Sequence, residues 1–151
     1  MEPRVITSFD DLRLDFNQLT ELLSSNNFNS RISSNSLNFF VLQSCFQIKE
    51  VHNNNYFRIL IEKIMKQNNF LKSKVNVDLF VGFTQGSISI IHHDDYDVFL
   101  FSLYGETMYI INKEKYLLKP GDLIKINKGE LHQAISLTPR IILSLAITKS
   151  E

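Results

Sequence analysis

The chain has 151 residues, a length typical of one domain, and 44% of them are hydrophobic, including 12 phenylalanines. No apolar run approaches the about 20 residues that a membrane span needs, so the composition is that of a soluble globular protein. Sixteen basic residues balance sixteen acidic ones, and neither sign forms a long block. This balance argues against general binding to nucleic acids or other polyanions.

Cys45 is the single cysteine, which excludes an intrachain disulfide and a zinc site built from thiolates. We interpret it as a small buried apolar residue. The first residues, 1–4, are polar and charged and lack the apolar segment of a signal peptide. A reducing, cytoplasmic location is therefore expected.

The N-terminal part of the chain predicts a helix from about residue 8 to residue 25. Thr7 or Ser8 can cap it. Its apolar positions recur at helical spacing: Phe9, Leu12, Phe16, Leu19, Leu22 and Leu23. The Ser- and Asn-rich stretch 24–36 predicts a loop, and the apolar run 37–43 predicts a buried strand.

A second amphipathic helix is predicted after the run 53–55, ending near Lys72. Its apolar face is formed by Phe57, Leu60, Ile61, Ile64 and Met65. From residue 75 onward, short runs of β-branched and aromatic residues are separated by glycine and proline. We expect strands at 75–83, 87–92, 97–104, 106–112, 115–118, 122–127, 131–137 and 140–148.

Eight short antiparallel strands favour a mostly β fold, a barrel or jelly roll, with the two helices packed on one outer sheet face. The sequence shows no internal repeat and no linker. We expect a single domain over 1–151, in which 1–74 form a helical cap and edge strand and 75–148 form the barrel core.

His92, Asp94 and His132 are the candidate metal ligands. Alternate residues of a strand share a face, so His92 and Asp94 can point the same way while His93 points away. A barrel can bring His132 alongside them from a later strand. Two imidazoles and one carboxylate form the facial triad favoured by non-haem Fe(II).

The residues near these candidate ligands also allow interpretations other than a metal site. The His- and Asp-rich run 92–95 is also compatible with an ordinary polar turn between strands. We expect Asp97 to stabilise the turn or to accept a hydrogen bond from a neighbouring strand. Tyr96 can line a pocket beside the metal, and His52 is expected at the surface.

The motifs around these residues resemble those of the JmjC-type, cupin-like oxygenases, nearest to the ribosomal-protein hydroxylase branch. The resemblance rests on His92-x-Asp94-x-Tyr96-Asp97-Val98-Phe99, on Pro120-Gly121-Asp122 and on Gly129-x-x-His132-Gln133-Ala134. It covers about 75–148. It implies a double-stranded β-helix in which His92, Asp94 and His132 hold Fe(II) and 2-oxoglutarate is the cosubstrate. By resemblance, a homodimer is also expected.

The sequence departs from this family at the cosubstrate pocket. Members carry Lys or Arg at the position of Thr107, and Tyr109 replaces a common Trp. Thr107 offers only a neutral hydroxyl, whereas a buried carboxylate favours a charge-assisted partner. Arg140 and Ser89 match positions that contact 2-oxoglutarate in other relatives. Arg140 can also be interpreted as a solvated residue at the start of the last strand.

The leading hypothesis is an Fe(II)- and 2-oxoglutarate-dependent hydroxylase acting on a peptide, protein or small molecule. Ribosomal-protein hydroxylases are much longer, so a small molecule or short peptide is the more natural substrate. The missing basic anchor favours a second hypothesis, a metal-dependent cupin (dioxygenase, lyase or isomerase) that does not use 2-oxoglutarate. A third is a non-catalytic cupin binding module.

Overall fold

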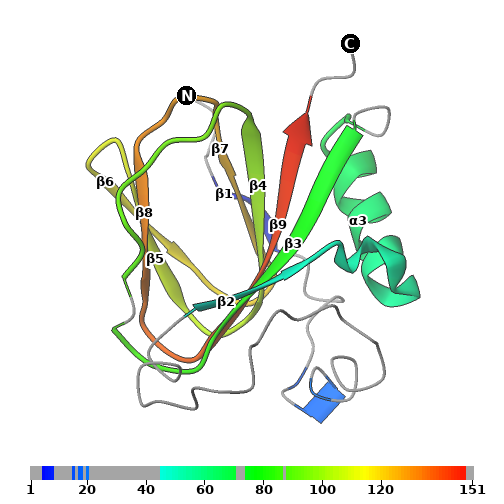
Figure 1. The fold of residues 1–151 in the computed structure, drawn as a ribbon, viewed down its shortest axis with the longest axis horizontal. Helices are drawn as coiled ribbons and strands as arrows, with labels where there is room; N and C mark the ends of the chain where they lie inside the picture. Colours follow the sequence, from blue (N-terminus) through cyan, green and yellow to red (C-terminus); the bar gives the residue numbers. More distant parts are fainter. Residues whose placement is uncertain are drawn as a thin grey trace, which may run out of the picture.

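The computed structural model describes residues 5–8, 15, 17, 18, 20, 45–70, 74–86 and 88–148. Within these residues the chain is mostly β, with one complete α-helix (Figure 1). The elements in chain order are β1 (Val5–Ser8), β2 (Cys45–Lys49), the 3-10 turn η2 (Val51–Asn53), α3 (Asn55–Gln67), β3 (Lys74–Gly82), β4 (Asp97–Tyr104), β5 (Thr107–Ile111), β6 (Glu114–Leu118), β7 (Asp122–Ile126), β8 (His132–Ser136) and β9 (Arg140–Thr148).

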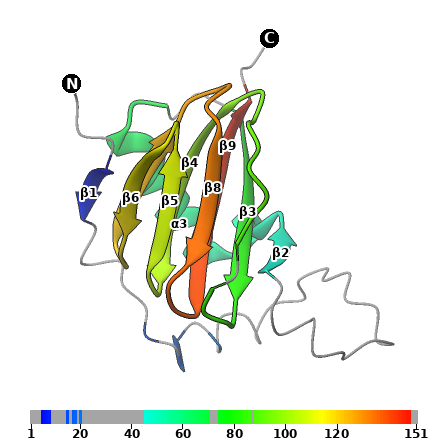
Figure 2. The ribbon, with the colours of Figure 1, turned by 90° about the vertical axis from the view of Figure 1, so that its left-hand side faces the viewer.

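The described strands form two antiparallel sheets. The larger has six strands in the order β1-β7-β4-β9-β3-β2, and the smaller has three in the order β6-β5-β8. Figure 2 shows the smaller sheet face-on, with its strands side by side in front of the larger sheet. Between the sheets lies an apolar core of Val98, Leu100, Tyr109, Ile111, Leu118, Ile124, Ile126, Ala134 and Ile142. The expectation of a mostly β fold is confirmed.

Helix α3 begins and ends through side-chain and backbone capping. Asn54 precedes it, and its Oδ1 accepts from the backbone N–H groups of Tyr56 and Phe57. At the other end Asn69 is left-handed (φ 61°), and the Phe70 N–H donates to the Met65 carbonyl at 3.0 Å. These bonds terminate the helix as a Schellman motif, so its end lies at Gln67 rather than near Lys72.

The apolar face of α3 covers the outer face of the larger sheet. Its buried residues are Phe57, Leu60, Ile61, Ile64 and Met65, the set that the periodicity predicted. They pack in one cluster with residues of β3, β4 and β9, including Leu79, Phe101 and Leu143. The larger sheet is therefore covered on both faces, by α3 outside and by the smaller sheet inside.

Three predictions about the N-terminal part have different outcomes. Residues 5–8 form a strand paired with β7, so Thr7 and Ser8 lie in β1 instead of capping a helix. Residues 17, 18 and 20 are helical as predicted, whereas residue 8 lies in a strand and residue 15 is not helical. The other residues of the predicted helix lie outside the described ones. The predicted loop 24–36 and strand 37–43 also lie outside them. Only α3 can be described as a helix on the sheet, where two were expected.

The predicted strand 87–92 is wrong. Ile88 and His92 make isolated bridges to β8, and the described residues between them are not in ladder geometry. The reason is local competition for hydrogen bonds. The Ser89 hydroxyl accepts from the Ala134 N–H at 2.8 Å, and the Gln133 side chain donates to the Ser89 carbonyl.

The turn between β4 and β5 requires glycine. Gly105 has φ 73°, and a Cβ added there would lie 1.9 Å from the Pro139 carbonyl oxygen. No side chain fits this contact. Among the described residues, no helix has both the length and the apolar character to cross a bilayer.

Candidate metal centre

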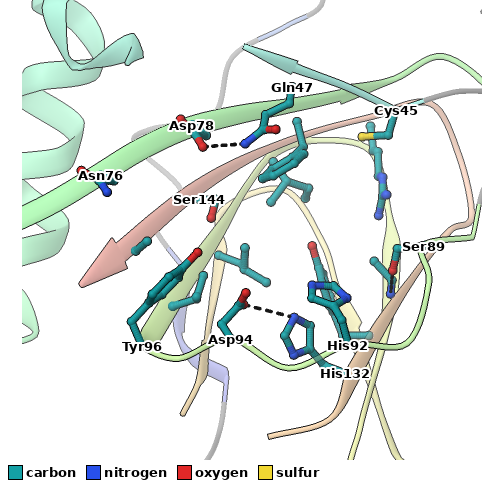
Figure 3. A pocket seen from close by; sticks show the side chains of 18 residues that line it. Cys45, Gln47, Asn76, Asp78, Ser89, His92, Asp94, Tyr96, His132 and Ser144 are labelled. Carbon is teal, nitrogen blue, oxygen red and sulfur yellow. Dashed lines mark hydrogen bonds and ion pairs between the residues drawn. The ribbon is translucent and has the colours of Figure 1, made fainter. Parts of the chain in front are cut away.

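The structure brings His92, Asp94 and His132 together at the edge of the smaller sheet. His132 opens β8, while His92 and Asp94 lie in the segment that precedes β4. One ligand atom of each residue lies within 4.8 Å of the others, and the His132 Nε2 is 3.6 Å from the Asp94 carboxylate (Figure 3). The donor set matches the facial triad expected from the sequence.

Reciprocal backbone hydrogen bonds fix the spacing of the two histidines. The His92 N–H donates to the His132 carbonyl at 3.1 Å, and the His132 N–H donates to the His92 carbonyl at 2.8 Å. The pair is an isolated antiparallel bridge. The two imidazoles are consequently close, with ring centroids 4.2 Å apart.

Backbone carbonyls also orient both imidazoles. The His92 Nδ1 lies 2.8 Å from the Ile90 carbonyl oxygen, and the His132 Nδ1 lies 2.9 Å from the Glu130 carbonyl oxygen. A carbonyl oxygen can only accept, so each Nδ1 carries the proton. The Nε2 lone pair of each ring is thereby available to a metal ion, which is the usual arrangement of metal-binding histidines.

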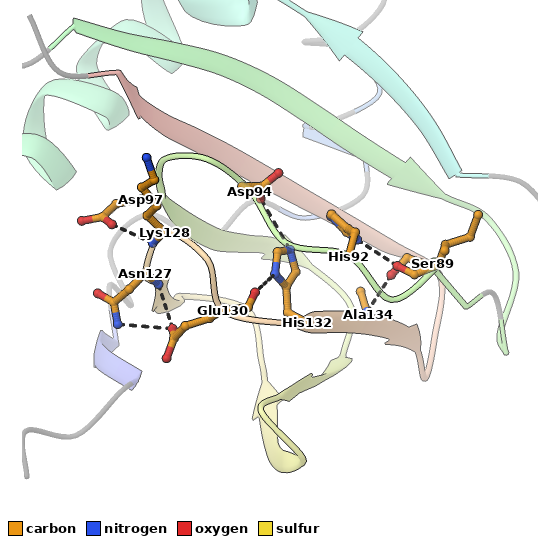
Figure 4. A network of polar contacts seen from close by, with 10 residues as sticks. Ser89, His92, Asp94, Asp97, Asn127, Lys128, Glu130, His132 and Ala134 are labelled. Atoms are coloured by element: carbon orange, nitrogen blue, oxygen red, sulfur yellow. Dashed lines mark hydrogen bonds and ion pairs between the residues drawn. The ribbon is translucent and has the colours of Figure 1, made fainter.

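Hydrogen bonds tie together the two loops that carry Asp94 and His132 (Figure 4). The Lys128 N–H donates to the Asp97 carboxylate at 2.9 Å, and the Gly129 N–H donates to the Asp94 carbonyl at 2.9 Å. The Lys125 ammonium lies 3.1 Å from the other Asp97 oxygen. Of the two predicted roles, the contact with a neighbouring strand is the ion pair to Lys125 of β7, and the hydrogen bond from Lys128 comes from the loop that follows β7.

Replacement of Asp97 tests this connection between the loops. We expect Asp97→Ala to lower the free energy of unfolding by about 1–2 kcal/mol, since a charged acceptor with two partners is lost. It should also weaken metal binding several-fold, because the Asp94 and His132 loops are no longer held in register. Asp95→Ala, in the same turn but exposed, is the matched control. Equal metal affinities of the two variants, measured by calorimetric titration, would contradict the prediction.

A cavity of about 340 Å³ opens between the two sheets and includes the triad in its wall. Asp94, His92 and His132 lie on one side of it, and β3 and β9 of the larger sheet lie on the other. Of the residues that the structure describes, eighteen line it: Cys45, Gln47, Asn76, Asp78, Phe80, Ser89, His92, Asp94, Tyr96, Val98, Leu100, Tyr109, His132, Ala134, Arg140, Ile142, Ser144 and Ala146.

Arg140 is buried in the wall of this cavity and is not a solvated residue at a strand start. Its side chain is 4% exposed, and its Nε and Nη1 have no hydrogen-bond partner among the described residues. Burial raises the pKa of the neighbouring Tyr109 to about 12, against the opposing effect of the Arg140 charge. Tyr109 therefore stays protonated beside a guanidinium that is available to an anion.

The remaining predicted cosubstrate residues fall into two groups. Tyr109 and Ser89 line the cavity, although the Ser89 hydroxyl is already engaged by the Ala134 N–H. Thr107 is fully buried on β5, its hydroxyl lacks a partner among the described residues, and it does not line the cavity. Its buried position on β5 is that of an ordinary residue on the interior face of a strand.

The structure also tests the predicted exposure of four further side chains. Tyr96 lines the cavity at 38% exposure, whereas His93 and His52 are exposed. Burial, followed by the charges of Asp94, Asp78 and Asp95, raises the pKa of Tyr96. Cys45 is exposed in β2 at the cavity, so its interpretation as a buried apolar residue is wrong. The edge position of β2 in the larger sheet explains that exposure.

Sequence reasoning missed the polar residues on the opposite wall, Gln47, Asn76, Asp78 and Ser144. A signal was present in the predicted strand 75–83. Valines and leucines occupy one set of alternate positions there, while Asn76 and Asp78 fall on the other set. Polar residues on the inner face of a strand indicate a cavity.

No protein-family model matches the sequence, and no curated protein matches it. Its structure is similar to solved structures. A ribosomal oxygenase from Escherichia coli, YcfD, solved with cobalt and 2-oxoglutarate, matches with a TM-score of 0.62 and 17% identity over 71% of this chain. The conserved protein SPY1581 of unknown function from Streptococcus pyogenes matches with a TM-score of 0.55 and 13% identity, over 83% of this chain and 97% of that one.

A cupin superfamily protein from Desulfitobacterium hafniense also matches, with a TM-score of 0.47 and 20% identity over 50% of this chain and 69% of that one. The chain spans about a third of the E. coli oxygenase, 32% of its length. The likenesses to YcfD and SPY1581 show a shared fold.

Proposed function

We propose that the protein is an Fe(II)- and 2-oxoglutarate-dependent oxygenase built on a double-stranded β-helix. One observation carries the proposal. The His92, Asp94 and His132 triad lines the same cavity as a buried guanidinium, Arg140, whose Nε and Nη1 lack partners. A metal site and a carboxylate site in one pocket are what a 2-oxo acid cosubstrate requires.

The donor set fits Fe(II). Two neutral imidazoles and one carboxylate supply three ligands and leave positions open for further oxygen ligands. Both imidazoles are already oriented with Nε2 free, by the Ile90 and Glu130 carbonyls. His92 and Asp94 are less buried than His132, so the open side of the site lies toward solvent and the cavity mouth.

Arg140 fits the far carboxylate of 2-oxoglutarate. A guanidinium can bind a carboxylate through two parallel hydrogen bonds, and a buried one binds it in a low dielectric. Other branches of the oxygenase superfamily place this arginine on the strand after the distal histidine, as here. Arg140 thus replaces the basic residue that Thr107 does not provide.

When bound, iron and 2-oxoglutarate supply oxidation of a substrate C–H bond coupled to decarboxylation of the 2-oxo acid to succinate. The residues of the chain bind and orient. Tyr109 keeps its proton and packs beside Arg140. The apolar side chains of Leu100 and Ile142 limit water in the cavity. The substrate is proposed to be a small molecule or peptide.

The same arginine is compatible with a second candidate, a metal-dependent cupin without 2-oxoglutarate. In that case the carboxylate bound by Arg140 belongs to a substrate that itself chelates the metal. The observation that favours it is the neutral, buried Thr107 at the position where the resembled family carries a basic residue.

Anaerobic titration of the Fe(II)-loaded protein with 2-oxoglutarate distinguishes the two. Bidentate chelation of iron by the 2-oxo acid produces a visible charge-transfer band, and we expect a saturable band. Succinate, which has a carboxylate but no 2-oxo group, is the control and should produce none. Iron binding without a band would favour the substrate-chelating cupin, and absence of iron binding would favour a binding module.

A further inference from the structure

The cavity wall opposite the triad carries a group of polar side chains that the proposed chemistry does not use. They come from three adjacent strands of the larger sheet and are Gln47 of β2, Asn76 and Asp78 of β3, and Ser144 of β9 (Figure 3). The register places Asp78 directly opposite Ser144, and Ser144 opposite Leu100 of β4. They therefore lie on the inner face of the larger sheet, toward its β2 edge.

The charges lining the cavity are unevenly divided. Among the described residues that line it, Arg140 is the one lysine or arginine, His92 and His132 are the histidines, and Asp78 and Asp94 are the carboxylates. In the proposed enzyme Asp94 binds the metal, and Arg140 binds the cosubstrate carboxylate. Asp78 is the acidic side chain of the cavity that is left for the substrate.

Asp78 is half-buried, and its partner in the described part of the chain is neutral. The Gln47 Nε2 donates to its Oδ2 at 2.7 Å. Lys49 lies opposite Asp78 in the register of β2 and β3 but is exposed, does not line the cavity, and forms no ion pair with Asp78 among the described contacts. A half-buried carboxylate without a counter-charge attracts a cation.

We propose that Asp78 determines substrate specificity and selects a substrate that carries a cationic nitrogen, an ammonium or guanidinium group. The proposal rests on the proposed function for the reaction and on the cavity for the substrate class. Asn76 and Ser144 lie beside Asp78 and supply neutral acceptors for the remaining N–H groups of such a cation. Anionic substrates are disfavoured because this wall offers no basic partner among its described residues.

Ligand-observed saturation-transfer NMR on the Zn(II)-loaded protein, with and without 2-oxoglutarate, tests the proposal without turnover. The probes are n-pentylamine and 1-pentanol, which match in length and differ in charge. We expect the amine to bind at least about tenfold more tightly, as a charge-assisted pair requires.

Two variants of Asp78 distinguish the effect of its negative charge on amine binding from the effect of its side-chain shape. Asp78→Asn retains an acceptor for Gln47 and should lose the preference for the amine, whereas Asp78→Glu retains the charge and should preserve it. Glu62→Gln removes one charge from the exposed surface of α3 and is the control. Equal binding of amine and alcohol, or a preference that survives in Asp78→Asn, would overturn the proposal.

Two alanine-based peptides, one with a single lysine and one with norleucine in its place, identify the source of the cation. If the lysine peptide binds more tightly than pentylamine, and this binding depends on Asp78, the result supports the proposal and indicates that the substrate is a protein side chain. The reverse order supports it with a small amine. The iron titration tests the reaction separately. If the charge-transfer band is present but the amine is not preferred, only the proposed role of Asp78 is overturned. If the amine is preferred but no band is present, only the proposed oxygenase function is overturned.

Discussion

His92→Ala and Asp94→Ala are each expected to abolish stoichiometric Fe(II) binding while the protein remains folded. Loss of an outer hydrogen-bond partner alone weakens metal sites by about 10–100-fold, so loss of a direct ligand should weaken this one by at least about 100-fold. Both residues lie outside the apolar clusters that hold the sheets together. We expect their free energies of unfolding without metal to stay within about 0.5–1 kcal/mol of the parent protein.

His93→Ala is the matched control for these variants. His93 neighbours both ligands in sequence but is exposed and outside the triad. Iron content after anaerobic loading, measured by metal analysis, and thermal unfolding of the metal-free proteins give the two readouts. Iron content near one per chain in His92→Ala and Asp94→Ala would refute the assignment of the site.

Arg140→Met is expected to have opposite effects on ligand binding and on stability. A hydrogen bond to a charged group contributes roughly 1.5–3 kcal/mol, so 2-oxoglutarate should bind about 10- to 150-fold more weakly. The metal-free protein, in contrast, should unfold a few degrees higher, because an apolar, shorter side chain replaces a buried guanidinium whose Nε and Nη1 lack partners among the described residues.

Arg58→Met controls for the general loss of a positive charge, since Arg58 is exposed on α3. Its affinity for 2-oxoglutarate and its unfolding temperature should both match those of the parent protein. The charge-transfer band gives the affinity, and calorimetry gives the unfolding temperature. Unchanged affinity in Arg140→Met would show that the cosubstrate, if bound, is held by other residues.

The strands of the β half could be predicted because their signals are local. Nearly continuous apolar runs define β4, which Gly105 follows, and β9, which Pro139 precedes. Their observed bounds equal the predicted 97–104 and 140–148. β1 and β2 were missed for a physical reason. Both have at most five residues and lie at the two edges of the larger sheet, so each offers only a short stretch in which a pattern could be recognised.

Some residues of the candidate site could likewise be predicted from the sequence, and others could not. His92, Asp94 and His132 could be named from their motif, and their approach depends on one bridge between distant segments. The burial of Arg140 could not be inferred, because it depends on the pairing of β9 with β3, which places Arg140 opposite Gly82. The role of Asp78 likewise requires knowing that Gln47, from the unpredicted strand β2, is its partner.

The reciprocal hydrogen bonds between the backbones of His92 and His132 also bear on metal selectivity. They fix the spacing of two ligands before any ion arrives, so little conformational entropy is lost when one binds. A site fixed in this way cannot readily rearrange into the square-planar geometry that Cu(II) prefers. Discrimination among divalent ions then depends on the rigidity of the scaffold as well as on the identity of the donor atoms.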